Sequence, residues 1–186
     1  MATLNDFRVV NGRLEDAGTS DLIFATSDGD WITIHSGDDL VQAYDGNDYI
    51  IDHTGVNGQG TSGADRIYAG TGDDVIVSTL DGAGNVYIGD DGIDMLNLAP
   101  MQYGVLVDLA QEMVQNRGTL DSSKVITIEN VFGTAFRDLL YGDSQANLLA
   151  GYGSDDLIRG QGGNDRLEGD DGFDVLVGKH DLDLDL

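Results

Sequence analysis

Residues 133–177 read GTAFRDLLY, GDSQANLLA, GYGSDDLIR, GQGGNDRLE and GDDGFDVLV, five nonapeptides that follow one another without a gap. Each unit begins with Gly, has Asp or Asn at place six, and has Leu or Ile at place eight. Places one to six are rich in turn-forming residues, whereas places seven to nine suit a strand of three residues. One unit cannot bury its own apolar face, so the pattern predicts a stack of repeating units.

The same phase runs through the first half of the chain. It gives the units 16–24, 25–33, 34–42 and 43–51, an eight-residue unit 52–59, then 60–68, 69–77, an irregular unit 78–88, and 89–97. Of the 14 units, 11 have Asp at place six, and three have the neutral residues Asn57, Asn85 and Asn147. Because side chains alternate along a strand, place eight should point inward. The predicted apolar spine consists of Ile23, Ile32, Val41, Ile50, Ile67, Ile76, Leu96, Leu140, Leu149, Ile158, Leu167 and Leu176.

Two nonapeptides per coil give an all-β fold, and we expect a right-handed parallel β-roll (a β-solenoid) with two short strands per coil. The expected organisation is one elongated domain. It consists of a lead-in (1–15), a first block (16–97), an irregular segment (98–132), a second block (133–178) and a tail (179–186). In the irregular segment the register breaks. There, 104–110 and 125–131 alternate like strands, and the polar stretch 111–124 is interpreted as a surface loop.

The charge of the chain is strongly acidic and is carried by Asp. Nine Lys and Arg stand against 34 Asp and Glu, a net charge of −25, and only four of the acids are Glu. This charge excludes non-specific binding of nucleic acid and argues against anionic membrane surfaces. No apolar run is long enough to span a membrane, and the absence of Cys excludes disulfides and thiolate metal sites.

The place-six carboxylates should lie above one another, because every second unit returns to the same edge of the roll about 4.8 Å further along. Such a column repels itself unless cations fill it. Ca²⁺ takes 6–8 oxygen ligands, which carboxylates and the carbonyls of Gly-rich turns can supply. We expect several Ca²⁺ ions and no other cofactor. Same-edge pairs are predicted between Asp156 and Asp174, Asp74 and Asp94, and Asp48 and Asp65.

The predicted ligands are place-six acids and residues of the glycine-rich turns. The acids are Asp39, Asp48, Asp65, Asp74, Asp94, Asp138, Asp156, Asp165 and Asp174. The turn residues are Gly37, Gly46, Gly72, Gly92, Gly151, Gly153, Gly160, Gly162, Gly169 and Asp171. We expect residues 98–132 to continue the roll with longer, metal-free turns that separate two calcium blocks.

The units GQGGNDRLE, GDDGFDVLV, GDDGIDMLN and AGTGDDVIV resemble the G-G-x-G-x-D-x-U-x nonapeptide of the repeats-in-toxin (RTX) haemolysin-type calcium-binding family. The resemblance implies a β-roll that binds Ca²⁺ through place-six Asp and turn carbonyls. It also implies export by the type I secretion machinery, folding outside the bacterial cell or at its surface, and membership of a larger polypeptide.

No catalytic residues are predicted. The chain has neither an H-E-x-x-H nor a G-x-S-x-G motif, so the protease and lipase that accompany such modules are absent. The first hypothesis is therefore a non-catalytic calcium-binding module of a secreted bacterial protein. The alternative is a carbohydrate-active or glycan-binding module, such as an accessory module of a uronate-polymer epimerase or lyase, or of an adhesin, with polysaccharide as partner. Candidate sugar-stacking rings, which otherwise suit strand rims, are Tyr44, Tyr68, Tyr87, Tyr141 and Tyr152.

Overall fold

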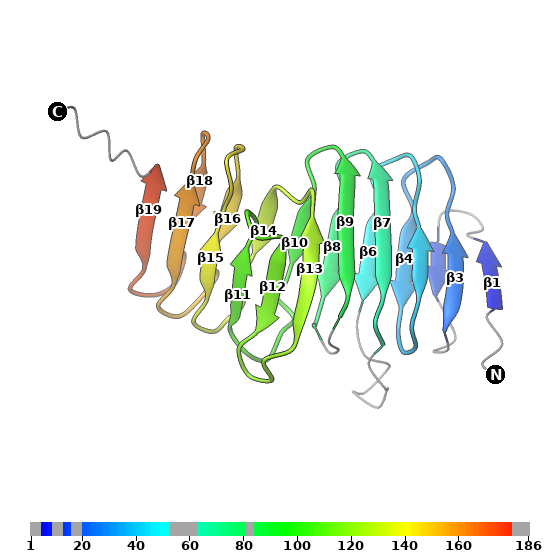
Figure 1. Cartoon of the computed structure of the whole chain (residues 1–186), viewed down its shortest axis with the longest axis horizontal. Helices are drawn as coiled ribbons and strands as arrows, with labels where there is room; N and C mark the ends of the chain where they lie inside the picture. Colours follow the sequence, from blue (N-terminus) through cyan, green and yellow to red (C-terminus); the bar gives the residue numbers. More distant parts are fainter. Residues whose placement is uncertain (1–4, 9–12, 16–19, 53–62, 81–83, 180–186) are drawn as a thin grey trace.

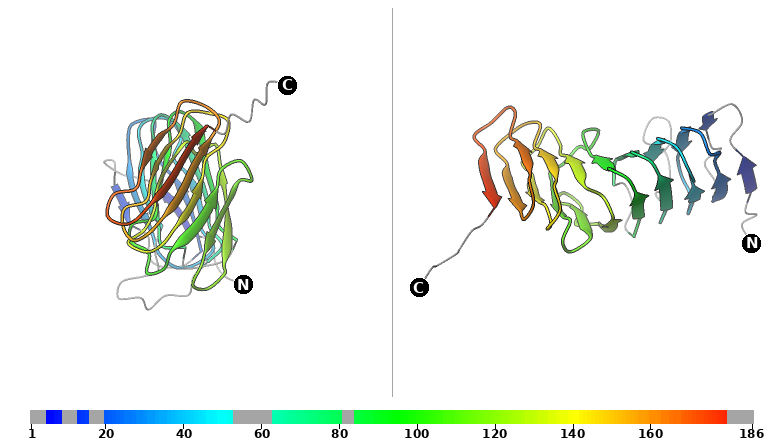
Figure 2. Two further views of the ribbon diagram at one scale, coloured as in Figure 1. Left: turned by 90° about the vertical axis from the view of Figure 1, so that its left-hand side faces the viewer. Right: turned by 90° about the horizontal axis from the view of Figure 1, so that it is seen from above.

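The computed structural model describes residues 5–8, 13–15, 20–52, 63–80 and 84–179. The described residues form two sheets that face each other (Figures 1 and 2). Sheet A contains, in spatial order, β1 (Asn5–Arg8), β3 (Asp21–Phe24), β5 (Leu40–Gln42), β7 (Arg66–Thr71), β9 (Val86–Asp91), β13 (Ser122–Ile126), β12 (Met113–Asn116), β11 (Val105–Asp108), β15 (Leu139–Tyr141), β17 (Leu157–Gln161) and β19 (Val175–Lys179). Sheet B contains β2 (Arg13–Glu15), β4 (Trp31–Ile34), β6 (Tyr49–Asp52), β8 (Val75–Ser78), β10 (Met95–Asn97), β14 (Asn130–Phe132), β16 (Leu148–Ala150) and β18 (Arg166–Glu168).

The chain passes alternately through the two sheets, and each regular strand pairs in parallel with the strand one coil earlier. Ile32 lies beside Ile50 in sheet B, and Val41 lies beside Ile67 in sheet A. The predicted all-β parallel β-roll with two strands per coil is therefore confirmed. In the described part of the chain, no helix is long and apolar enough to cross a lipid bilayer.

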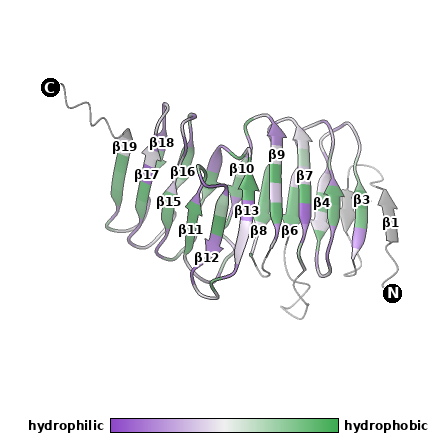
Figure 3. Cartoon of the chain, in the orientation of Figure 1, coloured by the Kyte–Doolittle hydropathy of each residue, from purple (hydrophilic) through white to green (hydrophobic). Residues whose placement is uncertain are grey.

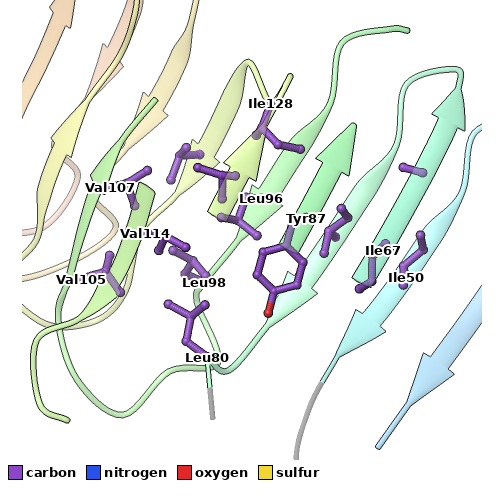
Figure 4. Close-up of a cluster of buried hydrophobic side chains, with 14 of the residues drawn as sticks. Ile50, Ile67, Leu80, Tyr87, Leu96, Leu98, Val105, Val107, Val114 and Ile128 are labelled. Carbon is purple, nitrogen blue, oxygen red and sulfur yellow. The ribbon is translucent and has the colours of Figure 1, made fainter. Parts of the chain in front are cut away.

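The core between the sheets is the place-eight spine. These side chains, from Ile23 to Ile158, are fully buried, and apolar residues recur in strand after strand (Figures 3 and 4). Burying one such side chain stabilises the fold by roughly 1.5–3 kcal/mol. Leu167 is only partly buried and Leu176 is 46% exposed, because both lie at the C-terminal end of the stack.

The irregular segment contributes three strands, β11 to β13, to sheet A but only one, β14, to sheet B. In sheet A, β11 and β12 pair antiparallel, as do β12 and β13, whereas in sheet B β10 pairs directly with β14. The surface-loop interpretation of 111–124 is wrong, because Met113–Asn116 forms β12 and Val114 is fully buried. Val114 is followed by the polar residues Gln115 and Asn116, of which Asn116 ends the strand. The sequence therefore shows no clear apolar alternation that would predict a strand here.

A polar cluster interrupts the apolar core at Tyr87, which is fully buried in β9 (Figure 4). Its hydroxyl donates to Oδ2 of Asp52 at 2.5 Å, lies 2.7 Å from Oγ of Ser78, and accepts from Nδ2 of Asn85 at 2.9 Å. Burial raises the pKa of Tyr87 well above its usual value. Tyr87 is therefore a core residue and not a sugar-stacking ring.

The described strands before and after the eight-residue unit 52–59 pair directly with one another, which contradicts the count of this unit as a half-coil. Strand β5 pairs directly with β7, and β6 pairs directly with β8, so no strand lies between them in either sheet. His53 and Asn57 lie outside the described residues, as does most of the tail.

Candidate metal centre

The turns form two edges. We call edge A the turns that lead into sheet A, and edge B the turns that lead into sheet B. On edge B, from Asp30 to Asp94, the backbone N–H of each place-six residue donates to the side chain of the next one along the roll. The distances are 2.7 Å from Asp30 to Asp48, 2.7 Å from Asp48 to Asp74, and 2.9 Å from Asp74 to Asp94. Place-six residues of neighbouring coils therefore form a continuous column.

Edge A carries the same ladder in two parts. In the first part, Asp21 donates to Asp39, Asp39 to Asp65, and Asp65 to Asn85, each at 2.8 Å. In the second part, the donor–acceptor pairs are Val105 with Asp138, Asp138 with Asp156, and Asp156 with Asp174, at 2.7, 2.8 and 3.0 Å. Strands β11 to β13 lie between the two parts.

The ladder uses only one oxygen of each carboxylate. Within the described residues, the buried Oδ2 atoms of Asp48, Asp74, Asp94 and Asp156 have no hydrogen-bond partner. The four side chains are at most 3% exposed. A buried carboxylate oxygen without a partner is costly, and a cation removes that cost.

The electrostatics of the columns also favour a cation. Burial raises the pKa of Asp48 and of Asp94 to about 7, and the pKa of Asp156 to about 6. Burial likewise raises the pKa of Asp138 to about 6, although the N–H groups of Thr134 and Val105 oppose the shift. The negative charge of neighbouring place-six residues adds to the increase at Asp48, Asp94 and Asp156.

In the units that begin with Gly, this leading Gly makes room for the carboxylate. A Cβ on Gly151 would lie 2.1 Å from Oδ2 of Asp156 and 3.0 Å from the carbonyl oxygen of Gly169 in the next turn. The place-six carboxylate thus turns back across place one of its own turn, toward a backbone carbonyl of the next coil. In these units the close approach of the carboxylate favours Gly at place one, since none of the described leading glycines has a positive φ. The units of Asp48 and Asp74 begin with Ala43 and Ala69 instead.

The glycine at place four serves a different purpose. Gly72 has φ +130°, a conformation that L side chains rarely adopt, and its Cβ would lie 2.0 Å from the carbonyl oxygen of Gly46. Carbonyls of successive turns therefore lie close to one another along the edge. Gly37, Gly46 and Gly92 also have positive φ.

These residues fit Ca²⁺. No three His, Asp or Glu side chains in the described ranges gather as a metal site built from side chains alone would need. The arrangement instead offers one or two carboxylates together with closely spaced carbonyls. Ca²⁺ accepts such a mixture of oxygen ligands.

The structure brings most of the predicted residues together. Asp39, Asp48, Asp65, Asp74, Asp94, Asp138 and Asp156 are buried in the columns, while Asp165 and Asp174 are half-buried at the C-terminal end. Gly151, Gly160 and Gly169 occupy place one, each against its own place-six carboxylate. Gly153, Gly162 and Asp171 occupy place three, where Gly153 and Asp171 form a parallel bridge between neighbouring turns.

One predicted pair is wrong and two are confirmed. The neighbour of Asp48 is Asp74, and Asp65 lies beside Asp39 on the other edge. The error came from counting 52–59 as a half-coil. This count assigned Asp65 to the edge of Asp48, and Asp74 to the opposite edge. Asp74 with Asp94, and Asp156 with Asp174, are neighbours as predicted.

The sequence reasoning missed Glu129. The backbone N–H of Asp94 donates to its Oε2 at 2.9 Å, so Glu129 takes the next place-six position on edge B. The statement that 98–132 breaks the register altogether is therefore wrong for edge B. The signal in the sequence was Val131 two residues later, which is fully buried at place eight.

The model of the RTX calcium-binding nonapeptide repeat matches four times, at residues 24–51, 59–96, 127–157 and 141–176. The repeats of this family bind several Ca²⁺ ions. Comparison with curated proteins finds no relative that matches. The four matches together cover more than half of the chain and coincide with the coils that carry the two columns, and the chain therefore belongs to the RTX calcium-binding nonapeptide repeat family.

Proposed function

We propose that this chain is a non-catalytic calcium-binding module of a secreted bacterial protein, which folds on Ca²⁺ after type I secretion. The observation that supports the proposal most strongly is the set of buried, unpartnered oxygens at Asp48, Asp74, Asp94 and Asp156. Without a cation these oxygens oppose folding, whereas Ca²⁺ that binds only the folded state stabilises it by mass action.

Each ion would lie between consecutive turns of one edge. In this proposal, place-six Asp residues contribute carboxylate oxygens, and residues at places one to four, including Gly46, Gly72 and Gly92, contribute carbonyls. The last ions of the second block would be held by the turns of Asp156, Asp165 and Asp174. The half-buried state of Asp165 and Asp174 leaves these terminal sites closer to solvent.

Circular dichroism of the full chain in EDTA and then in millimolar Ca²⁺ tests the proposal. We expect a largely unfolded chain in EDTA and a β signal after Ca²⁺ is added. Mg²⁺ at matched ionic strength is the control. It needs near-octahedral ligands at about 2.0–2.1 Å and should fail to fold the chain. A complete β signal in EDTA, or equal folding by Mg²⁺, contradicts specific coordination.

A groove on the outer face of sheet A favours the second candidate function, glycan binding. Arg66 and Tyr68 of β7 and Lys124 of β13 line the groove, together with one acidic residue, Glu112. Arg66, Val86 and Lys124 lie side by side on adjacent strands. Two cations beside an aromatic ring suit an acidic sugar, even in a chain of net charge −25. A glycan array with and without Ca²⁺, repeated with Arg66→Ala, tests this function; no signal in either condition rejects it.

A further inference from the structure

The junction between the two blocks is continuous on edge B. Ile88 lies beside Ile126 in sheet A, and Met95 lies beside Asn130 in sheet B. The first coil connects these positions through six residues (89–94), and the next coil does so through three (127–129). Thr127 therefore corresponds to place one and Glu129 to place six of a turn shortened by three residues.

Glu129 lies in this shortened turn, at a place where every other charged place-six residue is Asp. Its side chain is one methylene longer than that of Asp. Its Oε2 accepts from the N–H of Asp94 at 2.9 Å, the same distance that separates the N–H of Asp74 from Oδ1 of Asp94. Glu129 thus performs the same ladder contact with a longer side chain.

An independent observation points to a ligand at this position. Asp94 is completely buried, and its Oδ2 has no partner among the described residues. A Cβ on Gly89 would lie 2.2 Å from this Oδ2 and 2.2 Å from the carbonyl oxygen of Thr127. The two oxygens thus converge on one point, as Oδ2 of Asp156 and the carbonyl oxygen of Gly169 do at Gly151.

We infer that the turns of Asp94 and Glu129 hold a Ca²⁺ ion that extends the calcium column of the first block along edge B. Asp94 and Glu129 supply carboxylate oxygens and Thr127 supplies its carbonyl oxygen, while water completes the shell, because the short turn lacks places two to four. The inference rests on the proposed calcium-dependent function and adds a site to it. The irregular segment is then metal-free on edge A only.

The test compares calcium stoichiometry by titration calorimetry for the wild-type chain and three variants. Glu129→Gln keeps an acceptor for the N–H of Asp94 but removes the charge, and we expect one ion fewer. Glu129→Asp keeps the charge but is too short, and we also expect one ion fewer. Glu112→Gln is the matched control, since Glu112 is exposed and lies outside both columns. It should bind as many ions as the wild type.

Two outcomes are distinguishable from each other. If the wild-type chain binds Ca²⁺ and both Glu129 variants bind the same number of ions, the inference is overturned while the proposed function stands. If the wild-type chain binds none, the proposed function itself fails. Anomalous diffraction from crystals of the Ca²⁺-saturated wild-type chain answers the question even if a variant does not fold. We expect an ion peak between Asp94 and Glu129, and the absence of a peak there overturns the inference.

Discussion

The two edges of the roll carry the same repeat but differ at the irregular segment. On edge B the ladder passes from Asp94 to Glu129, and Nδ2 of Asn147 in the second block donates to the carbonyl oxygen of Glu129. On edge A the column stops at Asn85 and resumes at Asp138, with β11 to β13 in between. The comparison shows that one sheet can gain strands while the opposite edge keeps its ladder, because each sheet is stabilised by its own hydrogen bonds.

The neutral place-six residues Asn85 and Asn147 lie next to the irregular segment, where the two edges differ. Nδ2 of Asn85 donates to the Tyr87 hydroxyl at 2.9 Å, and Nδ2 of Asn147 donates to the carbonyl oxygen of Glu129 at 3.0 Å. In each case the amide NH₂ stands where an Asp would have a carboxylate oxygen, and this NH₂ has a hydrogen-bond acceptor in the protein. Asn85 ends the first column of edge A, and Asn147 follows the short turn of edge B. The columns lose charge where the repeat departs from regularity.

The largest effect is expected for Asp74→Ala, in the middle of edge B. Asp74 has a place-six neighbour on each side, so its loss should weaken two calcium positions and leave the N–H of Asp48 without its acceptor. At 100 times Kd each lost ion removes about 2.7 kcal/mol of stability, and the unsatisfied N–H adds about 1–3 kcal/mol. Asp174→Ala, at the end of edge A, should have about half this effect on bound Ca²⁺. Equal losses of Ca²⁺ would refute the column arrangement.

A smaller loss is expected when Asn85 becomes acidic. Asn85→Asp places a carboxylate beside the Tyr87 hydroxyl, whose proton already goes to Asp52. The new oxygen has no donor there, so we expect the Ca²⁺-saturated chain to lose about 1–3 kcal/mol. Thermal unfolding in excess Ca²⁺ measures the change. A gain in stability together with one additional ion would show that edge A accepts a cation at this position.

The pH dependence of folding and of Ca²⁺ binding should differ between edge A and edge B. In the metal-free fold, burial holds the pKa of Asp48 and Asp94 at about 7 and that of Asp156 at about 6, above the unfolded value of about 3.9. The folded state then binds more protons between about pH 4 and pH 7, so its stability falls as pH rises through this window. In EDTA, acidification from about pH 8 to about pH 5 should promote folding. Circular dichroism measures the change.

In Ca²⁺ the same acidification should release ions, because protons compete for the carboxylates. The sites of Asp48 and Asp94 on edge B should empty at higher pH than the site of Asp156 on edge A. Calcium stoichiometry of Asp94→Asn and Asp156→Asn at successive pH values distinguishes the two groups. Simultaneous release from both edges would contradict the order.

The smallest effect is expected for Asn147→Asp. The substitution removes the hydrogen bond to the carbonyl oxygen of Glu129, a loss of about 1 kcal/mol, but it offers a carboxylate beside that carbonyl. We expect the number of bound ions to rise by one with little change in melting temperature. An unchanged number of ions would show that the column of edge B ends at Glu129.

The nine-residue period was enough to predict the spine, because place eight is apolar from Ile23 to Ile158 and the side chains of a strand alternate. The period also identified both columns. It failed where a unit changed length. The unit 52–59 was counted as a half-coil, and so Asp48 was paired with Asp65 instead of Asp74.

Glu129 and Tyr87 were missed for different physical reasons. The turn before Glu129 is three residues shorter, so the phase is lost although the contact to Asp94 persists. Tyr87 occupies place eight, where its ring is apolar enough for the core, but its hydroxyl needs Asp52 on the opposite sheet. No sequence period reveals such a contact between β9 and β6.

The cluster around Tyr87 has a consequence for how a repetitive chain finds its correct stacking. Every regular turn offers the same ladder contact, so coils displaced by one full repeat would satisfy the same hydrogen bonds. Tyr87, Asp52 and Ser78 occur together only once among the described coils. A displaced stack would bury the Asp52 carboxylate opposite an aliphatic side chain, at a penalty of several kcal/mol. The cluster thus fixes the register of the stack, because it favours one alignment of the coils over others with equivalent hydrogen bonds.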